Sequence, residues 1–189
     1  MNIIGYGEDF LTLWALTRKI SDILVQLKDN TDPKSCVLIY KPTFGRAGRN
    51  MDRQRAEFGE FDSILIAAEN VYLIESKWDG NDQRKKRVNL HKTQVKRHKI
   101  FSWYFNNWED GGDWDQFISD KSGDFTSHFP ENEIASTSSI LKKNLVEVMS
   151  LVGKRSLHNV LMYFHCGDPQ DLRLDYPDVI FKKGSNSLL

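Results

Sequence analysis

Two acidic residues and a lysine, Asp62, Glu75 and Lys77, interrupt an otherwise apolar stretch of this 189-residue sequence. Side chains alternate along a β-strand, so Glu75 and Lys77 share one face at the end of a strip of apolar residues. Asp62 likewise shares a face with the isoleucines that follow it. If the two runs fold back through a turn at residues 67–70, the three charged groups meet at one end of a hairpin.

Such a group of side chains is suited to bind a divalent metal ion. Mg²⁺ prefers oxygen ligands and keeps several waters, so we expect Asp62, Glu75 and the backbone carbonyl of Ser76 to hold Mg²⁺, with Mn²⁺ as a substitute. A metal at this point polarises a phosphodiester and lowers the pKa of a bound water. Lys77 then orients that water and stabilises charge that develops on the phosphate. We expect no organic cofactor.

The spacing Glu-x-Lys also occurs as an ordinary ion pair on an exposed strand edge. Apolar residues on the same face weigh against that alternative, because they place the charged pair at the margin of a core. Charges are rarely found there without a partner or a function.

Charge is distributed unevenly along the chain, although the formal net charge is zero. Residues 34–99 contain 15 lysines and arginines against 8 acidic residues, whereas residues 106–133 contain one lysine against 8 acidic residues. A basic region of this kind favours contact with a polyanion, and we expect DNA as the partner. The acidic region is expected to be a surface insertion, the alternative being a segment that covers a basic groove.

Three groups of basic side chains are candidates for contact with nucleic-acid phosphates. The first lies in a glycine- and arginine-rich loop at residues 41–58, which fits a solvated surface equally well, and the other two precede and line a predicted helix. The candidates are Arg46, Arg49, Arg53, Arg55, Arg84, Lys85, Lys86, Arg87, Lys92, Lys96 and Lys99.

The hydrophobic pattern predicts a single α/β domain over residues 1–189. Helices are predicted at 8–28, 88–108 and 139–152, and strands at 36–40, 59–66, 71–79, 159–164 and 179–181. Residues 106–139 are rich in glycine, aspartate and serine and are expected to form an irregular acidic insertion.

Composition also bears on where the protein works. Cys36 and Cys166 stand alone, outside any metal-binding spacing, which favours free thiols in a reducing compartment. Glu8 and Asp9 precede any apolar segment of a signal peptide, and no run is long enough to span a membrane. We expect a cytoplasmic protein without membrane contact. The histidines lack metal spacing and are expected to be surface or hydrogen-bonded groups.

A family resemblance rests on two short segments, Gly59-Glu60-Phe61-Asp62 and Ile74-Glu75-Ser76-Lys77. Together they resemble the D…(D/E)-x-K signature of the PD-(D/E)XK nuclease superfamily, and they are most similar to its NERD and Mrr-like branch and to small restriction endonucleases. The resemblance implies a restriction-endonuclease-like core. In that core a mixed sheet, flanked by helices, combines an antiparallel three-strand meander with a fourth strand that joins by a helical crossover.

The resemblance also implies roles for individual residues. Asp62 and Glu75 are the implied metal ligands, Ser76 lends its carbonyl, and Lys77 is the implied catalytic lysine. Glu8 resembles the additional acidic metal ligand that many members carry on their first helix.

Two further residues are supporting candidates, and two positions depart from the pattern. Glu60 is a candidate ligand or neighbouring acid, and Gln94 resembles a glutamine that some branches place near the site. Phe61 stands where the family name has proline. A literal Pro177-Asp178 pair follows the Glu-x-Lys segment and does not fit the order of the signature.

These observations predict a Mg²⁺-dependent endonuclease that hydrolyses DNA phosphodiester bonds. A cutter of palindromic sites favours a two-fold homodimer. The main alternative is a DNA- or RNA-binding module that keeps the scaffold without turnover, and a further alternative is an α/β interaction domain with a surface ion pair.

Overall fold

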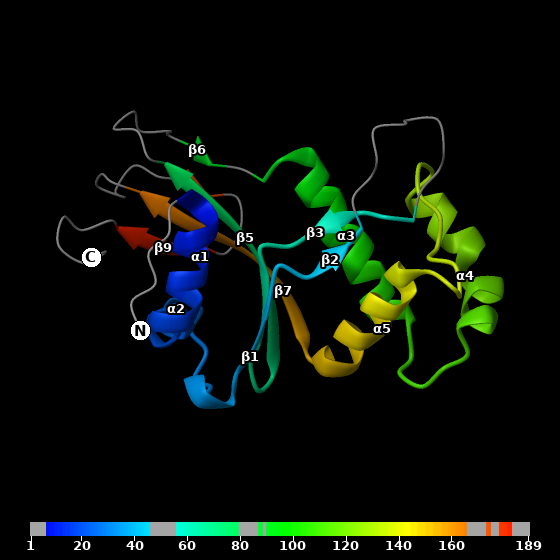
Figure 1. Cartoon of the computed structure of the whole chain (residues 1–189), viewed down its shortest axis with the longest axis horizontal. Helices are drawn as coiled ribbons and strands as arrows, with labels where there is room; N and C mark the ends of the chain where they lie inside the picture. Colours follow the sequence, from blue (N-terminus) through cyan, green and yellow to red (C-terminus); the bar gives the residue numbers. More distant parts are fainter. Residues whose placement is uncertain are drawn as a thin grey trace. The chain divides into compact units, whose positions relative to one another are not determined.

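The computed structural model describes residues 7–45, 56–79, 87–88, 90–165, 173–174 and 178–182. The chain forms two compact units (Figure 1). We call the first the sheet unit, which comprises Met1–Tyr40, Phe61–His91 and Ser156–Leu189. The second, the helical unit, comprises Lys41–Glu60 and Lys92–Arg155.

A mixed five-stranded sheet forms the centre of the sheet unit (Figure 1). Its strands, in spatial order, are β1 (Val37–Tyr40), β4 (Ser63–Ile66), β5 (Asn70–Asp79), β7 (Ser156–His165) and β9 (Asp178–Lys182). The first three run antiparallel as a meander, whereas β7 is parallel to β5 and β9 is parallel to β7. The predicted α/β class, the meander and the parallel fourth strand are therefore confirmed.

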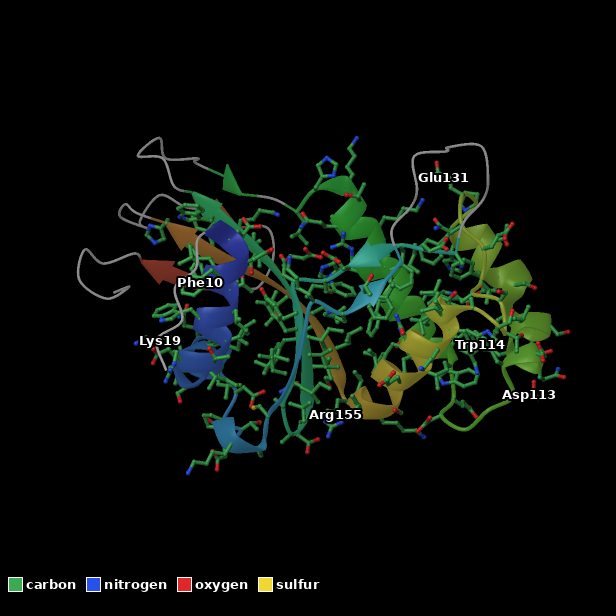
Figure 2. The ribbon with its side chains drawn as sticks, viewed as in Figure 1. Phe10, Lys19, Asp113, Trp114, Glu131 and Arg155 are labelled. Carbon is green, nitrogen blue, oxygen red and sulfur yellow. The ribbon has the colours of Figure 1, made fainter. Side chains whose placement is uncertain are left out.

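Two helices cover one face of this sheet. They are α1 (Gly7–Arg18) and α2 (Ile20–Gln26), and their apolar side chains form one core with Leu65, Tyr72 and Ile74. The sequence predicts one continuous helix over 8–28, but Lys19 lies between the two helices with a φ of −124° (Figure 2). The apolar stripe continues across this break, so hydrophobic periodicity alone does not reveal it.

The loop after α2 and the turn of the β4–β5 hairpin are both closed by local hydrogen bonds. Asp32 caps a short 3₁₀ turn, η1 (Pro33–Ser35), by accepting a hydrogen bond from the Lys34 N–H at 3.0 Å. The turn between β4 and β5 closes with a bond from the Ala67 N–H to the Asn70 carbonyl at 2.8 Å. The predicted hairpin turn at 67–70 is therefore confirmed.

The helical unit contains α3 (Lys92–Asn107), α4 (Trp114–His128) and α5 (Ile140–Val152), with the short strands β2 (Thr43–Phe44) and β3 (Gly59–Glu60) paired antiparallel. Ser139 caps α5 and Gly153 ends it with a φ of +59°, so the predicted helix at 139–152 is confirmed. The predicted start of α3 at Val88 is wrong. Arg87–Val88 forms strand β6, which pairs with β8 (Arg173–Leu174), and the backbone becomes helical only at Lys92.

The segment expected to be an irregular acidic insertion contains the 15-residue helix α4. Asp113 caps it by accepting a hydrogen bond from the Gln116 N–H at 2.9 Å, and Trp114 begins its first turn (Figure 2). Trp114, Phe117 and Phe125 are buried within an aromatic cluster. The prediction failed because glycine, serine and aspartate dilute the apolar pattern, while a few large aromatic residues supply the buried surface.

No helix within the described ranges is long and apolar enough to cross a membrane.

Candidate active site

The candidate site lies where β4 ends beside the longer strand β5. The ladder pairs Ser63 with Ile74, so Asp62, one residue before β4, is level with Glu75. Strand β5 continues to Asp79, beyond the last pairing with β4. Its backbone N–H groups on this edge therefore need partners other than a strand.

Two carboxylates supply those partners. The Ser76 N–H donates to Asp62 Oδ2 at 2.7 Å, and the Trp78 N–H donates to Glu8 Oε2 at 2.8 Å. Glu8 comes from the first turn of α1. The N–H and C=O of one strand residue point to the same edge, so the Ser76 carbonyl faces the side on which Asp62 lies. The carboxylates of Asp62 and Glu8 and the backbone carbonyl of Ser76 therefore lie along the same edge of β5.

Glu75 and Lys77 occupy the sheet face that α1 and α2 do not cover. Leu73 precedes them on this face and is fully buried. Glu75 is only 1% exposed, whereas Lys77 is partly exposed. The alternation predicted from the sequence therefore holds, and the carboxylate of Glu75 is far more buried than an ordinary surface acid.

Asp62 is electrostatically coupled to the other three charged groups. Its pKa is raised to about 6, chiefly by burial and to a smaller extent by the negative charges of Glu75 and Glu8. The Ser76 N–H and the positive charge of Lys77 act in the opposite direction. The structure therefore brings together Asp62, Glu75 and Lys77, which the strand pattern singled out, and Glu8, which the family resemblance implied.

The donor set at this edge fits a hard divalent cation. Carboxylate oxygens and a backbone carbonyl are ligands that Mg²⁺ accepts, and Mg²⁺ is commonly held by one or two carboxylates with several waters. Within the described residues, no group of three or more His, Cys, Asp and Glu side chains is close enough to hold a metal. A site of this kind therefore relies on two carboxylates, the Ser76 carbonyl and water.

The neighbouring strand β7 carries polar residues that the sequence analysis did not assign to the site. Lys77 is level with Tyr163 in the parallel ladder, so the two side chains share a face. Tyr163 is buried and its ring stacks on His165 at a centroid distance of 5.8 Å. The signal available in the sequence was the change from apolar to polar residues at the end of 159–165, which matches the change along β5.

Glu60 and Gln94 belong to the helical unit. The sequence predicts one strand over 59–66 with Glu60 and Asp62 on the same face, but the strand is interrupted at Phe61 and Asp62. Glu60 lies in β3, where its carboxylate is 4.0 Å from the Lys41 ammonium. Gln94 lies in the first turn of α3 and is partly exposed.

Most of the predicted phosphate contacts cannot be placed. The candidates Arg46, Arg49, Arg53, Arg55, Arg84, Lys85 and Lys86 lie outside the described residues, as do Cys166 and Pro177. Arg87 contributes backbone to β6. On α3, Lys92 and Lys99 are exposed, whereas the Lys96 ammonium lies 2.7 Å from the carboxylate of Glu131.

Arg97 is a basic residue of α3 that sequence reasoning missed. Its guanidinium lies against Gly59, where a Cβ would approach it to 2.9 Å, and Gly59 has a φ of +106°. The backbone conformation therefore favours glycine at this position, whereas the flexible end of Arg97 could move to admit a Cβ. The sequence showed Gly59 within the Gly-Glu-Phe-Asp segment, but it did not show that Arg97 packs against this glycine.

Comparison with protein-family models, with curated proteins and with solved structures finds no match for this chain.

Proposed function

We propose that this protein is a divalent-metal-dependent endonuclease that hydrolyses DNA phosphodiester bonds with a PD-(D/E)XK-type active site. One observation carries the proposal. Asp62 and Glu8 accept hydrogen bonds from the N–H groups of Ser76 and Trp78 on the unpaired edge of β5, beside Glu75 and Lys77. The order of elements supports it. An N-terminal helix, an antiparallel meander, helices and a parallel strand follow one another in the order expected of a restriction-endonuclease-like core.

Asp62, Glu75 and the Ser76 carbonyl are the groups that would hold Mg²⁺, with Glu8 as a further acid at the same edge. When bound there, the ion polarises the phosphodiester and lowers the pKa of a bound water. The protein fixes these ligands before substrate arrives, because the Ser76 N–H holds Asp62 at 2.7 Å. Preorganised groups of this kind need little rearrangement during the reaction.

Lys77 supplies the positive charge at the site. It shares a face with Glu75 and is partly exposed, so its ammonium can reach a phosphate that approaches from solvent. In the proposed reaction it orients the attacking water and stabilises the additional negative charge on the phosphate oxygens. Removing the ammonium therefore affects the rate of cleavage more than the binding of metal.

The test is cleavage of plasmid and linear DNA by Asp62→Ala, Glu75→Ala and Lys77→Ala variants, with Mg²⁺, with Mn²⁺ and with EDTA. Each variant is expected to lose about 100-fold or more of the metal-dependent rate. Circular dichroism checks that each variant is folded. Cleavage that survives all three substitutions overturns the proposal.

Ser76→Ala is the matched control. The Ser76 hydroxyl is fully buried and has no hydrogen-bond partner among the residues that the structure describes, so its removal should leave the fold intact. The proposed ligand at this position is the backbone carbonyl. We expect this variant to cleave DNA at close to the unmodified rate. DNA binding with steep salt dependence but without metal-dependent cleavage would instead identify the non-catalytic binding module.

A further inference from the structure

An exposed tryptophan directly follows the proposed catalytic lysine. Trp78 is 39% exposed and is the only aromatic residue among the large exposed hydrophobic residues in the described part of the chain. By comparison, Trp14 packs against the core of the sheet unit. The hydroxyls of Tyr40 and Tyr72 donate hydrogen bonds to the Asp9 carbonyl and to the Asp29 carboxylate. A ligand that covers the exposed part of this ring would remove apolar surface from water, which favours binding.

The backbone of Trp78 is fixed although its ring is exposed. Its N–H donates to Glu8 Oε2 at 2.8 Å, and its position in the parallel ladder is level with Phe164 of β7. The ring therefore extends from a rigid strand that is held on both edges. A rigid aromatic surface loses little entropy when a ligand stacks on it.

Trp78 is also close to the reacting groups along β5. Side chains advance by about 3.3 Å per residue along a strand, so the Trp78 position lies about 7 Å from the Ser76 carbonyl. Glu8 touches the Trp78 backbone at the same edge at which Asp62 binds Ser76. By strand alternation the Trp78 ring projects from the sheet face opposite Glu75 and Lys77, so it borders this edge from the other side of the sheet. A nucleotide next to a phosphate bound at the edge would meet the indole on that side.

We propose that Trp78 stacks on an unpaired base next to the cleaved phosphate, and that the enzyme therefore prefers DNA with unpaired nucleotides at the cleavage position. The inference rests on the proposed function, because it takes its substrate from that function. Base pairs inside a duplex stack on one another and offer no free face, so a base that stacks on Trp78 must leave the duplex or be single-stranded. Stacking accepts any base, which predicts a preference for DNA structure and little preference for sequence.

Binding measured without cleavage tests this inference. Fluorescently labelled DNA is titrated with the full chain carrying Lys77→Ala, alone or combined with Trp78→Ala or Trp78→Phe. The three DNAs are a single strand, a duplex of the same length, and that duplex with a short unpaired flap. Trp78→Ala is expected to weaken binding of the single strand and the flap by about 5- to 100-fold and to leave the duplex unchanged.

Two controls accompany the titration. Trp78→Phe keeps an aromatic face and is expected to retain most of the affinity, whereas Val25→Ala removes a more exposed apolar side chain from α2 and is expected to change nothing. Thermal melting shows whether Trp78→Ala is folded; should it unfold, Trp78→Gln serves in its place. Equal losses on duplex and flap, or no loss on either, overturn the inference.

Cleavage by the unmodified chain separates this inference from the proposed function. Metal-dependent cleavage without any effect of Trp78 on flap binding leaves the nuclease assignment intact and removes the stacking role. Selective loss of flap binding in a chain that never cleaves DNA supports the stacking role and removes the nuclease assignment.

Discussion

Asp62 experiences two opposed influences in the metal-free protein. Burial and the nearby acids raise its pKa, whereas the Ser76 N–H and Lys77 favour its charged form, and the net pKa is about 6. The ordinary pKa of this side chain is 3.8, so the folded protein binds the Asp62 proton more tightly than the unfolded chain does. A carboxylate that is held ready for a cation should therefore cost stability whenever the cation is absent.

Asp62→Asn is expected to stabilise the metal-free protein at pH 8. The folded pKa of Asp62 lies above its unfolded value, so its contribution to stability is full below pH 3.8 and is lost as the pH rises through about 6. The ionised group costs on the order of 3 kcal/mol above that pH, and the amide oxygen of asparagine can still accept the Ser76 N–H. With EDTA at pH 8, the melting temperature should rise by roughly 5 to 10 °C.

Three comparisons complete this measurement. The advantage of Asp62→Asn should shrink as the pH falls toward 4, and added Mg²⁺ should raise the melting temperature of the unmodified protein alone. Asp22→Asn changes an exposed aspartate of α2 and should have little effect at either pH. A lower melting temperature for Asp62→Asn at pH 8 contradicts the account.

At the scale of elements, Asp29 ties the β4–β5 hairpin to the helices that supply Glu8. Its Oδ2 accepts hydrogen bonds from the Tyr72 hydroxyl at 2.6 Å and from Asn70 Nδ2 at 3.0 Å, while its Oδ1 accepts from the Thr31 N–H and hydroxyl. Burial raises the pKa of Asp29, but these hydrogen bonds outweigh it and lower the pKa to about 2. The hairpin and the loop after α2 are thus joined through one ionised carboxylate.

Tyr72→Phe is expected to lower the free energy of unfolding by about 1.5 to 3 kcal/mol at pH 7, because it removes a hydrogen bond to a charged acceptor. Its ring and its stacking on His158 remain. The pKa of Asp29 is lower in the folded state, so this stabilisation is present above pH 3.8 and is lost as the pH falls toward 2. Urea unfolding at pH 7 and at lower pH measures both effects.

Tyr40→Phe is the matched control for this change. The Tyr40 hydroxyl donates to the neutral carbonyl of Asp9 at 2.9 Å, so its removal should cost about 1 kcal/mol and should not depend on the ionisation of Asp29. Equal losses for both variants at every pH would show that the charge of Asp29 contributes nothing to this tie.

Elements with strong periodicity and clear ends were predictable from the sequence. The helix α5 is one example, because Ser139 and Gly153 mark its ends and its apolar residues recur at helical spacing. The helix α4 is the opposite case, since its capping residue Asp113 stands among other acidic and glycine residues. Local pattern identifies an element only where its buried face is continuous in the sequence.

In the candidate site, too, the local features were predictable from the sequence, whereas the contacts between distant residues were not. Strand alternation alone placed Glu75 and Lys77 on one face, as the structure has them. The bond from the Trp78 N–H to Glu8 joins residues 70 positions apart, and the interruption of the strand at Asp62 depends on the pairing of β3 with β2. Such non-local contacts follow from tertiary packing, which spacing along the chain does not encode.

At the scale of the whole molecule, the acidic segment matters through the net charge. The formal net charge is zero because the acidic residues of 106–133 offset the basic residues of 34–99. Long-range attraction of DNA depends on the summed charge, and it acts on the rate of encounter more than on the contacts in the final complex. If DNA is the substrate, as we propose, the acidic segment should slow association with it without changing how many phosphates the protein contacts.

Neutralising three exposed acids, with Glu109→Gln, Asp110→Asn and Glu133→Gln together, tests this view by changing the net charge from zero to +3. Association with DNA, followed by stopped flow, should accelerate on the order of threefold at about 0.05 M salt, and the gain should fade toward about 0.3 M as screening shortens the reach of charge. The charge-conserving set Glu109→Asp, Asp110→Glu and Glu133→Asp controls for changes of shape.

The slope of log affinity against log salt should stay the same in the neutralised variant, because it counts the phosphates contacted. A steeper slope in the neutralised variant would instead show that the acidic segment covers basic residues that DNA could otherwise reach.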